Sequence, residues 1–166
     1  AVGNPQINDG KIGKGRYFDG SNYLTCSDTD CGGTSKLDYS GSGAISMGAW
    51  VKHPTIGNYD TILSKYGPGT IGYQLFLLTS GQVRFIIYNG SSGSETNSTI
   101  LINDNNWYYI VAVWDGTSNT GGVKIYIDGT LNVTGTHVYG LPNTTAAFQI
   151  GKSNSSWPYP MHGYID

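Results

Sequence analysis

The side chains that could carry out catalysis are few in this sequence of 166 residues. Hydrolysis of a glycosidic bond needs a pair of carboxyl groups, one as an acid and one as a nucleophile or base. The sequence has one glutamate, Glu95, in the polar stretch 90–95. The two carboxylates closest to each other in the sequence are Asp28 and Asp30, and they lie in a turn-rich loop. No Gly-x-Ser-x-Gly element is present for a nucleophilic serine. The sequence therefore predicts no catalytic residues and a protein that is not an enzyme.

Aromatic side chains in loops are the stronger candidates, because a flat ring stacks on the apolar face of a sugar while polar neighbours bind its hydroxyl groups. In the segment 155–162, Trp157 and Tyr159 alternate with prolines, which keep the segment out of a central strand. Tyr59 and Tyr66 lie in two further loops. These four aromatic residues are the predicted ligand-binding residues. For Trp157 the alternative is that its ring covers the core beneath a long loop.

Cys26 and Cys31 are the only cysteines, and the residues between them favour turns. A loop that folds back lets the two thiols bridge, and so short a ring stabilises the fold by about 2 kcal/mol. A zinc site needs about four ligands, and the three histidines are scattered along the chain. We therefore predict a disulfide, which indicates an oxidising, extracytoplasmic compartment, either secreted or at the cell surface.

The composition argues against two classes of partner. Charged residues make up 12% of the chain and the net charge is −2, so the basic surface that nucleic acids require is not indicated. No apolar run approaches the roughly 18 residues of a membrane span. We therefore expect no nucleic-acid partner and no membrane insertion.

Strands rather than helices are predicted to position these residues. No stretch keeps the helical spacing of apolar residues, and the 25 glycines interrupt the chain throughout. A hairpin is expected to turn at Asp128-Gly129, a pair that suits positive φ angles. Including this hairpin, turn signals and alternating apolar residues predict strands at 16–19, 22–25, 44–52, 61–65, 72–79, 82–88, 99–102, 107–114, 123–133 and 146–151.

The tryptophans on predicted strands are expected in the core. The run 107–114 is apolar on both faces, which is typical of a central strand that is covered on both sides. Trp107 and Trp114 bound this run, and Trp50 lies on another strand. Core packing is the favoured role for all three, with ligand contact as the alternative.

Seven short motifs occur in one order along the chain. They are Gly10–Lys14 with Phe18–Tyr23, Ile45–Lys52, Ile62–Lys65, Trp107–Gly116, Val123–Gly129, Ile150–Gly151 and Gly163–Asp166. In this order they resemble the laminin-G-like branch of the concanavalin A-like lectin/glucanase superfamily. The resemblance implies an all-β fold, an antiparallel two-sheet jelly-roll sandwich of the concanavalin A-like kind. Residues 1–166 would then form a single laminin-G-like domain.

The two ends of the chain depart from the family pattern. Members usually carry one strand before the Gly-Lys motif and another after the Ile-Asp motif at 165–166. The chain is therefore expected to lack the family's first and last strands. Either it is a piece of a longer polypeptide, or a neighbouring subunit supplies the missing sheet edges.

The resemblance also implies a structural calcium ion, because related domains hold Ca²⁺ with carboxylates and backbone carbonyls. Asp19 and Asp166 suit a site near the termini, and Asp60 suits a loop site. These three aspartates are the predicted metal ligands. The alternative for Asp19 is a turn residue, since a glycine follows it. No cofactor other than Ca²⁺ is implied.

The function that these observations favour is a non-catalytic carbohydrate-binding or adhesion module of a secreted or cell-surface protein, with a glycan or a surface protein as its partner. The alternative is a structural subunit or displayed domain of an extracellular assembly such as a pilus, sheath, spike or capsid decoration. Its partners would then be neighbouring copies of the chain or further domains of the same protein. A third interpretation is an accessory domain of an enzyme that degrades polysaccharides. The fold by itself does not choose among these classes.

Overall fold

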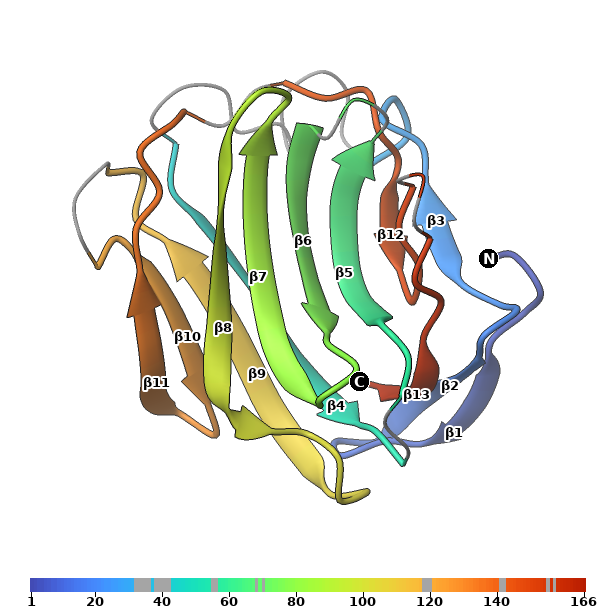
Figure 1. Ribbon diagram of the computed structural model, residues 1–166. Helices are drawn as coiled ribbons and strands as arrows, with labels where there is room; N and C mark the ends of the chain where they lie inside the picture. Colours follow the sequence, from blue (N-terminus) through green and yellow to red (C-terminus); the bar gives the residue numbers. More distant parts are fainter. Residues whose placement is uncertain are drawn as a thin grey trace.

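The computed structural model describes residues 1–31, 37, 43–54, 57–67, 69, 71–117, 121–140, 143–154, 156 and 158–166. These residues form two antiparallel sheets that face each other, and no helix (Figure 1). The predicted all-β sandwich is therefore confirmed. Within these ranges, no helix has the length and apolar character that a membrane crossing needs.

The back sheet, which is the more distant one in Figure 1, has seven strands in the order β1-β2-β13-β4-β9-β10-β11. Two of its inner strands, β4 and β9, pair along the full length of both. In sheet order, the strands are β1 (Gln6–Asp9), β2 (Lys14–Asp19), β13 (His162–Ile165), β4 (Ile45–Lys52), β9 (Trp107–Trp114), β10 (Val123–Ile127) and β11 (Thr130–Gly135).

The front sheet, which faces the viewer in Figure 1, has six strands in the order β3-β12-β5-β6-β7-β8. Its central part is the meander β5-β6-β7-β8, in which each strand pairs with the next along the chain. In sheet order, the strands are β3 (Leu24–Cys26), β12 (Phe148–Ile150), β5 (Asp60–Gly67), β6 (Ile71–Leu77), β7 (Gln82–Asn89) and β8 (Gly93–Leu101).

Apolar side chains from the facing surfaces of the two sheets form the core. Along each strand, successive side chains point to opposite faces, so every second residue reaches this interior. The front sheet contributes Leu75 and Phe85, and the back sheet contributes Ile110, Trp114 and Ile125, all fully buried or nearly so. The alternating pattern read from the sequence thus separates core residues from the residues of the outer faces.

The predicted hairpin joins β10 to β11. Ile125 is buried whereas its neighbour Tyr126 is half-buried, as the alternation indicated. The turn has φ angles of 51° at Asp128 and 78° at Gly129, which are the positive values expected of this pair. The hairpin is therefore confirmed in position and in turn chemistry.

Strand β8 corrects one sequence-based expectation. Glu95 was expected in a loop over 90–95, with a strand only at 99–102, but β8 begins at Gly93 and places Glu95 opposite Ile86 of β7. The first part of β8 gives no strand signal in the sequence, because its inward positions Thr96 and Ser98 carry hydroxyl groups rather than apolar side chains. It lies at the edge of the sheet, where a polar sequence is common.

The tryptophans give a second correction. Trp114 is buried in the core, as expected, but Trp50 and Trp107 are half-buried on the outer face of the back sheet. β9 is an inner strand of the sheet, yet among the described residues nothing covers its outer side. The exposure of Tyr109, 39% of its surface, shows this. Trp50 packs instead against Tyr109 of the neighbouring strand, with ring centroids 5.2 Å apart. Cross-strand aromatic pairs of this kind stabilise a sheet on its solvent-exposed face.

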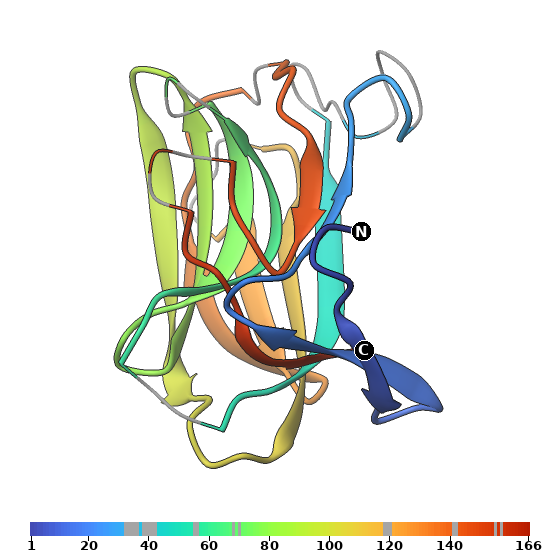
Figure 2. The same cartoon turned by 90° about the vertical axis from the view of Figure 1, so that its right-hand side faces the viewer.

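The described residues between β12 and β13, which are 151–154, 156 and 158–161, run along the outer side of the front sheet, and we call them the crossing loop (Figure 2). The Met161 N–H donates to the Gly151 carbonyl at 2.9 Å and closes the base of the loop. The Ser64 hydroxyl of β5 lies 3.4 Å from the Ser153 hydroxyl of the loop, and both residues are buried. The crossing loop therefore covers part of a sheet face that would otherwise be open.

Candidate functional site

Five aromatic side chains, Tyr59, Tyr66, Phe76, Tyr88 and Tyr159, lie together on the outer side of the front sheet and form what we call the aromatic cluster. Tyr159 stacks on Phe76, with centroids 5.8 Å apart and ring planes inclined by 18°, and its ring lies 4.7 Å from that of Tyr59. Tyr66 meets Tyr88 edge to face at 6.2 Å. The cluster is separate from the core, and it joins β5, β6 and β7 to the crossing loop.

Strand register brings Tyr66 and Tyr88 together. Tyr66 of β5 lies opposite Gly72 of β6, and Gly72 lies opposite Tyr88 of β7. Because glycine has no side chain, the two rings can meet across the strand between them. Gly72 has a φ of 122°, and a Cβ there would lie 1.9 Å from the Lys65 carbonyl oxygen, so no other residue fits this position.

The crossing loop holds Tyr159 in an unusual backbone conformation. Tyr159 lies between Pro158 and Pro160 and has a φ of 38°, a left-handed value that residues other than glycine rarely adopt. Its carbonyl accepts a 2.9 Å hydrogen bond from the Thr61 N–H of β5, and the Pro158 carbonyl accepts one of 2.8 Å from the Ser153 N–H. These bonds fix the loop so that the Tyr159 ring is presented on the sheet before any ligand arrives. Strained residues of this kind concentrate at functional sites.

Three polar side chains, Arg84 of β7 with Glu95 and Asn97 of β8, lie beside the aromatic cluster, and we call them the polar edge. Arg84 reaches Glu95 with 2.7 Å between its Nη1 and the carboxylate Oε2, and its Nε donates to the Asn97 side-chain oxygen at 2.7 Å. The Tyr88 hydroxyl donates to the other carboxylate oxygen of Glu95 at 3.0 Å. The Arg84 guanidinium also lies 6.0 Å above the centre of the Phe76 ring. The polar edge is therefore bonded directly to the aromatic cluster.

Three tyrosines of the cluster, Tyr66, Tyr88 and Tyr159, keep their hydroxyl protons at neutral pH. Burial raises the pKa of Tyr66 to about 12, with further contributions from Tyr88, Glu95 and Tyr159. The pKa of Tyr88 is raised by burial and by its hydrogen bond to Glu95, and the pKa of Tyr159 is raised by burial and by Tyr59. The phenols are thus neutral groups that both donate and accept hydrogen bonds.

The structure brings three of the four predicted ligand-binding residues together. Tyr59, Tyr66 and Tyr159 come from three separate stretches of sequence and meet in the aromatic cluster. Trp157 lies outside the described residues. Tyr66 was predicted in a loop, but it lies on β5, and only 8% of its surface is exposed.

Five members of the site were not predicted: Phe76, Arg84, Tyr88, Glu95 and Asn97. The signal for Arg84 and Tyr88 was present, since they alternate with core residues on one strand. Pairing Arg84 with Glu95, however, requires the register of β7 against β8, which the polar sequence of β8 concealed.

The three predicted metal ligands lie in separate places. Asp19 accepts hydrogen bonds from the Ser21 N–H at 2.9 Å and the Ser21 hydroxyl at 2.7 Å, which is the turn role that was the alternative. Asp166 accepts a bond of 2.6 Å from the Ile12 N–H. In the described part of the chain, no group of three or more His, Cys, Asp or Glu side chains is arranged to hold a metal ion. Calcium binding stays a prediction, and nothing that follows depends on it.

Asp60 is fully buried between two histidines. Its carboxylate lies 3.1 Å from His53 Nε2 and 2.9 Å from His162 Nδ1, and one oxygen also accepts the His162 N–H at 2.6 Å. Burial acts to raise the pKa of Asp60, but the close contacts with His53 and His162 outweigh it and hold the pKa below its usual range. The group ties the start of β5 to β13, next in the chain to Tyr59.

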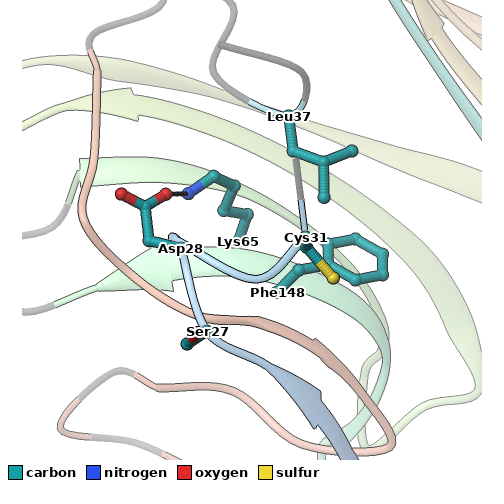
Figure 3. Close-up of a pocket in the computed structure, with 6 residues that line it drawn as sticks. All are labelled: Ser27, Asp28, Cys31, Leu37, Lys65 and Phe148. Atoms are coloured by element: carbon teal, nitrogen blue, oxygen red, sulfur yellow. Dashed lines mark hydrogen bonds and ion pairs between the residues drawn. The ribbon is translucent and has the colours of Figure 1, made fainter. Parts of the chain in front are cut away.

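The cysteine loop is anchored by a buried lysine (Figure 3). Cys26 and Cys31 form the predicted disulfide, with 5.6 Å between their Cα atoms. Lys65, with 1% of its surface exposed, donates from Nζ to the Asp28 carboxylate at 2.6 Å and to the carbonyls of Thr144 and Ala146 at 2.9 and 2.8 Å. The lysine ammonium thus occupies the oxygen-lined place that a bound cation would use. The negative charge of Asp28 is paired with the Lys65 ammonium there.

Comparison with known proteins identifies a family. A laminin G-type family model, described as the concanavalin A-like lectin/glucanases superfamily, matches residues 18–166. No curated protein matches the chain.

Solved structures share the fold. Domain 4 of AbnA, a GH43 extracellular arabinanase from Geobacillus stearothermophilus, in complex with arabinotriose, has a TM-score of 0.68 and 22% identity, covering 99% of this chain and 73% of that one. The CBM40 of the Ruminococcus gnavus IT-sialidase, bound to alpha2,3 sialyllactose, has a TM-score of 0.70 and 16% identity, covering 91% of this chain and 85% of that one. Domains LG4-5 of the mouse laminin alpha1 chain have a TM-score of 0.57 and 15% identity, covering 97% of this chain and 40% of that one.

Proposed function

Since the chain belongs to the concanavalin A-like lectin/glucanases superfamily, we propose that it is a non-catalytic carbohydrate-binding module with the aromatic cluster as its glycan-binding site. The observation that carries this proposal is the convergence of Tyr59, Tyr66, Phe76, Tyr88 and Tyr159 on one sheet face beside a row of polar side chains. Aromatic rings stack on sugar faces, and convergent polar groups bind the hydroxyls. The arabinanase domain and the sialidase module, which are similar in fold, were both solved with glycans, and this supports the same class of ligand.

Pre-organisation makes the aromatic cluster suited to binding. Phe76 is almost fully buried and forms a rigid floor, whereas Tyr59 exposes 39% of its surface and Tyr159 is half-buried. The stacking of Tyr159 on Phe76 and its backbone bond to Thr61 fix the ring before a sugar arrives. Little conformational entropy is then lost on binding, which favours affinity.

The carboxylates near the site do not support catalysis. Glycoside hydrolysis of the retaining kind needs two carboxyl groups roughly 5 Å apart. Among the described residues, the polar edge offers one carboxylate, Glu95, and it is engaged by Arg84 and Tyr88. Asp60 is fully buried between its histidines. Binding without turnover is therefore the function that this arrangement supports.

The disulfide between Cys26 and Cys31 supports a secreted or cell-surface location, because such bonds persist in oxidising compartments. A second candidate, a displayed or structural domain of an extracellular assembly, is favoured by a different observation. Trp50, Trp107 and Tyr109 are partly exposed on the outer face of the back sheet, and exposed aromatic groups are common at protein contacts. A partner of that kind would dock on the opposite side of the molecule from the glycan.

The test is a glycan panel followed by calorimetry with matched variants. The unmodified protein should bind at least one glycan. Phe76 is avoided because it is buried, so Tyr88→Ala is the site variant and Tyr109→Ala, on the back sheet, is the matched control. We expect Tyr88→Ala to weaken binding about tenfold or more, equivalent to roughly 1.4 kcal/mol, and Tyr109→Ala to leave it unchanged. Absence of binding to every glycan, or an equal loss in both variants, would contradict the proposal.

A further inference from the structure

The positive charge of Arg84 is paired with a negative charge of the protein. Its Nη1 lies 2.7 Å from the Glu95 carboxylate, and its Nε donates to Asn97 at 2.7 Å. The guanidinium plane is also held 6.0 Å over the Phe76 ring. The Glu95 carboxylate therefore balances the positive charge of this guanidinium, and both Nε and Nη1 already donate to neighbouring side chains.

No other described cation is placed to replace Arg84. Among the described residues, Arg84 is the one whose positive charge acts on the cluster tyrosines Tyr88 and Tyr159. Lys65 is the sequence neighbour of Tyr66, but its ammonium is bonded to Asp28 at the cysteine loop. Lys152, at the start of the crossing loop, lies 4.4 Å over the ring of Tyr23. The described surface around the aromatic cluster is therefore electrically balanced.

The polar edge keeps capacity to accept hydrogen bonds. The Glu95 side chain is 42% exposed, and each of its oxygens carries one bond from the protein, to Arg84 or to Tyr88. A carboxylate oxygen has about two acceptor sites, so each oxygen can take one more donor. A sugar hydroxyl can donate to them without breaking any bond already present.

An acidic sugar meets a different situation. A uronic acid or sialic acid carboxylate that bound to Arg84 would lie close to the Glu95 carboxylate, which already balances the charge of the guanidinium. Two negative charges would then share one positive charge, and like charges at close range cost binding energy. We infer that this site, if it binds glycans as proposed above, selects neutral oligosaccharides and rejects acidic ones, and that Glu95 determines this specificity.

The test compares neutral glycans with matched acidic ones. Oligogalacturonates are used as free acids and as their uncharged methyl esters, together with neutral cello-, manno- and arabino-oligosaccharides. The unmodified protein should bind a neutral glycan at least tenfold more tightly than an acidic one, with an affinity that barely depends on salt. Glu95→Gln keeps the shape of the side chain but frees the charge of Arg84. It should gain about tenfold or more for the free acids, with a new salt dependence.

Two further variants make the result specific. In the double variant Glu95→Gln with Arg84→Gln, the gained affinity for free acids should disappear. Asp9→Asn, which removes the partner of Lys14 on the back sheet, should leave the preference unchanged. Tight, salt-sensitive binding of the free acids by the unmodified protein would overturn the inference while leaving the proposed function intact. A failure to bind any glycan, neutral or acidic, would overturn both.

Discussion

Tyr159 offers the sharpest prediction, because its ring and its backbone have opposite effects on stability. The ring contacts Phe76 and Tyr59 at centroid distances of 5.8 and 4.7 Å. Aromatic pairs contribute roughly 0.5–1.5 kcal/mol each, so Tyr159→Ala should lower the free energy of unfolding by about 1–3 kcal/mol. Alanine also keeps the cost of a left-handed φ of 38°, which is roughly 1–2 kcal/mol for a residue other than glycine.

Tyr159→Gly separates the two effects. Glycine adopts positive φ without strain, but it makes the unfolded chain more flexible, at a cost of about 0.4–1 kcal/mol. The difference leaves Tyr159→Gly more stable than Tyr159→Ala by about 0.8 kcal/mol, the middle of a range from roughly 0 to 1.6 kcal/mol. Both variants lack the ring, so both should lose glycan affinity to the same extent.

Urea denaturation followed by tryptophan fluorescence measures these differences, since the chain has four tryptophans. The ranking of the two variants is the decisive quantity. If Tyr159→Gly is no more stable than Tyr159→Ala, the strain assigned to this residue is wrong. If neither variant is less stable than the parent, the stacking of the ring makes no contribution to the fold.

Three further predictions concern stability. Burial lowers the pKa of His137 below 6.5 in the folded protein, so the unfolded chain binds more protons and the free energy of unfolding should fall as the pH drops below about 6.5. His137→Gln should flatten this dependence in urea titrations across that range, and an unchanged slope would contradict the assignment. Reduction of the Cys26–Cys31 bond should cost about 2 kcal/mol, measured with and without a reductant. Lys65→Met should lower the free energy of unfolding by about 2–4 kcal/mol, because it leaves Asp28 and two carbonyls without their cation. If the reduced protein or the Lys65→Met variant is as stable as the parent, the stabilising role of that disulfide or that lysine is refuted.

The sequence predicts the fold well wherever one face of a strand is apolar. The hairpin of β10 and β11 follows from the alternation around Ile125 and from the turn at Asp128-Gly129. The sequence pattern indicates only the end of β8, because the inward residues Thr96 and Ser98 are polar. Periodicity detects only strands that bury apolar side chains, so a polar edge strand gives little signal.

The candidate site could be predicted only in part. Prolines on both sides of Tyr159 indicated an aromatic residue held in a loop, and the structure places it against Phe76. The pairing of Arg84 with Glu95 joins two strands through their register, which residue types alone do not specify. Trp107 shows the converse limit, because it lies on a strand that is apolar on both faces, and the pattern does not reveal which face is left uncovered.

Whether the aromatic cluster binds glycans is tested most directly by amide chemical-shift mapping of the labelled protein during titration with the best glycan from the panel. The account predicts that the perturbed amides concentrate at Tyr59, Tyr66, Phe76, Tyr88 and Tyr159 and at the polar edge on β7 and β8. Perturbations that cluster instead around Trp50 and Tyr109 on the back sheet, or that spread without a focus, would contradict it.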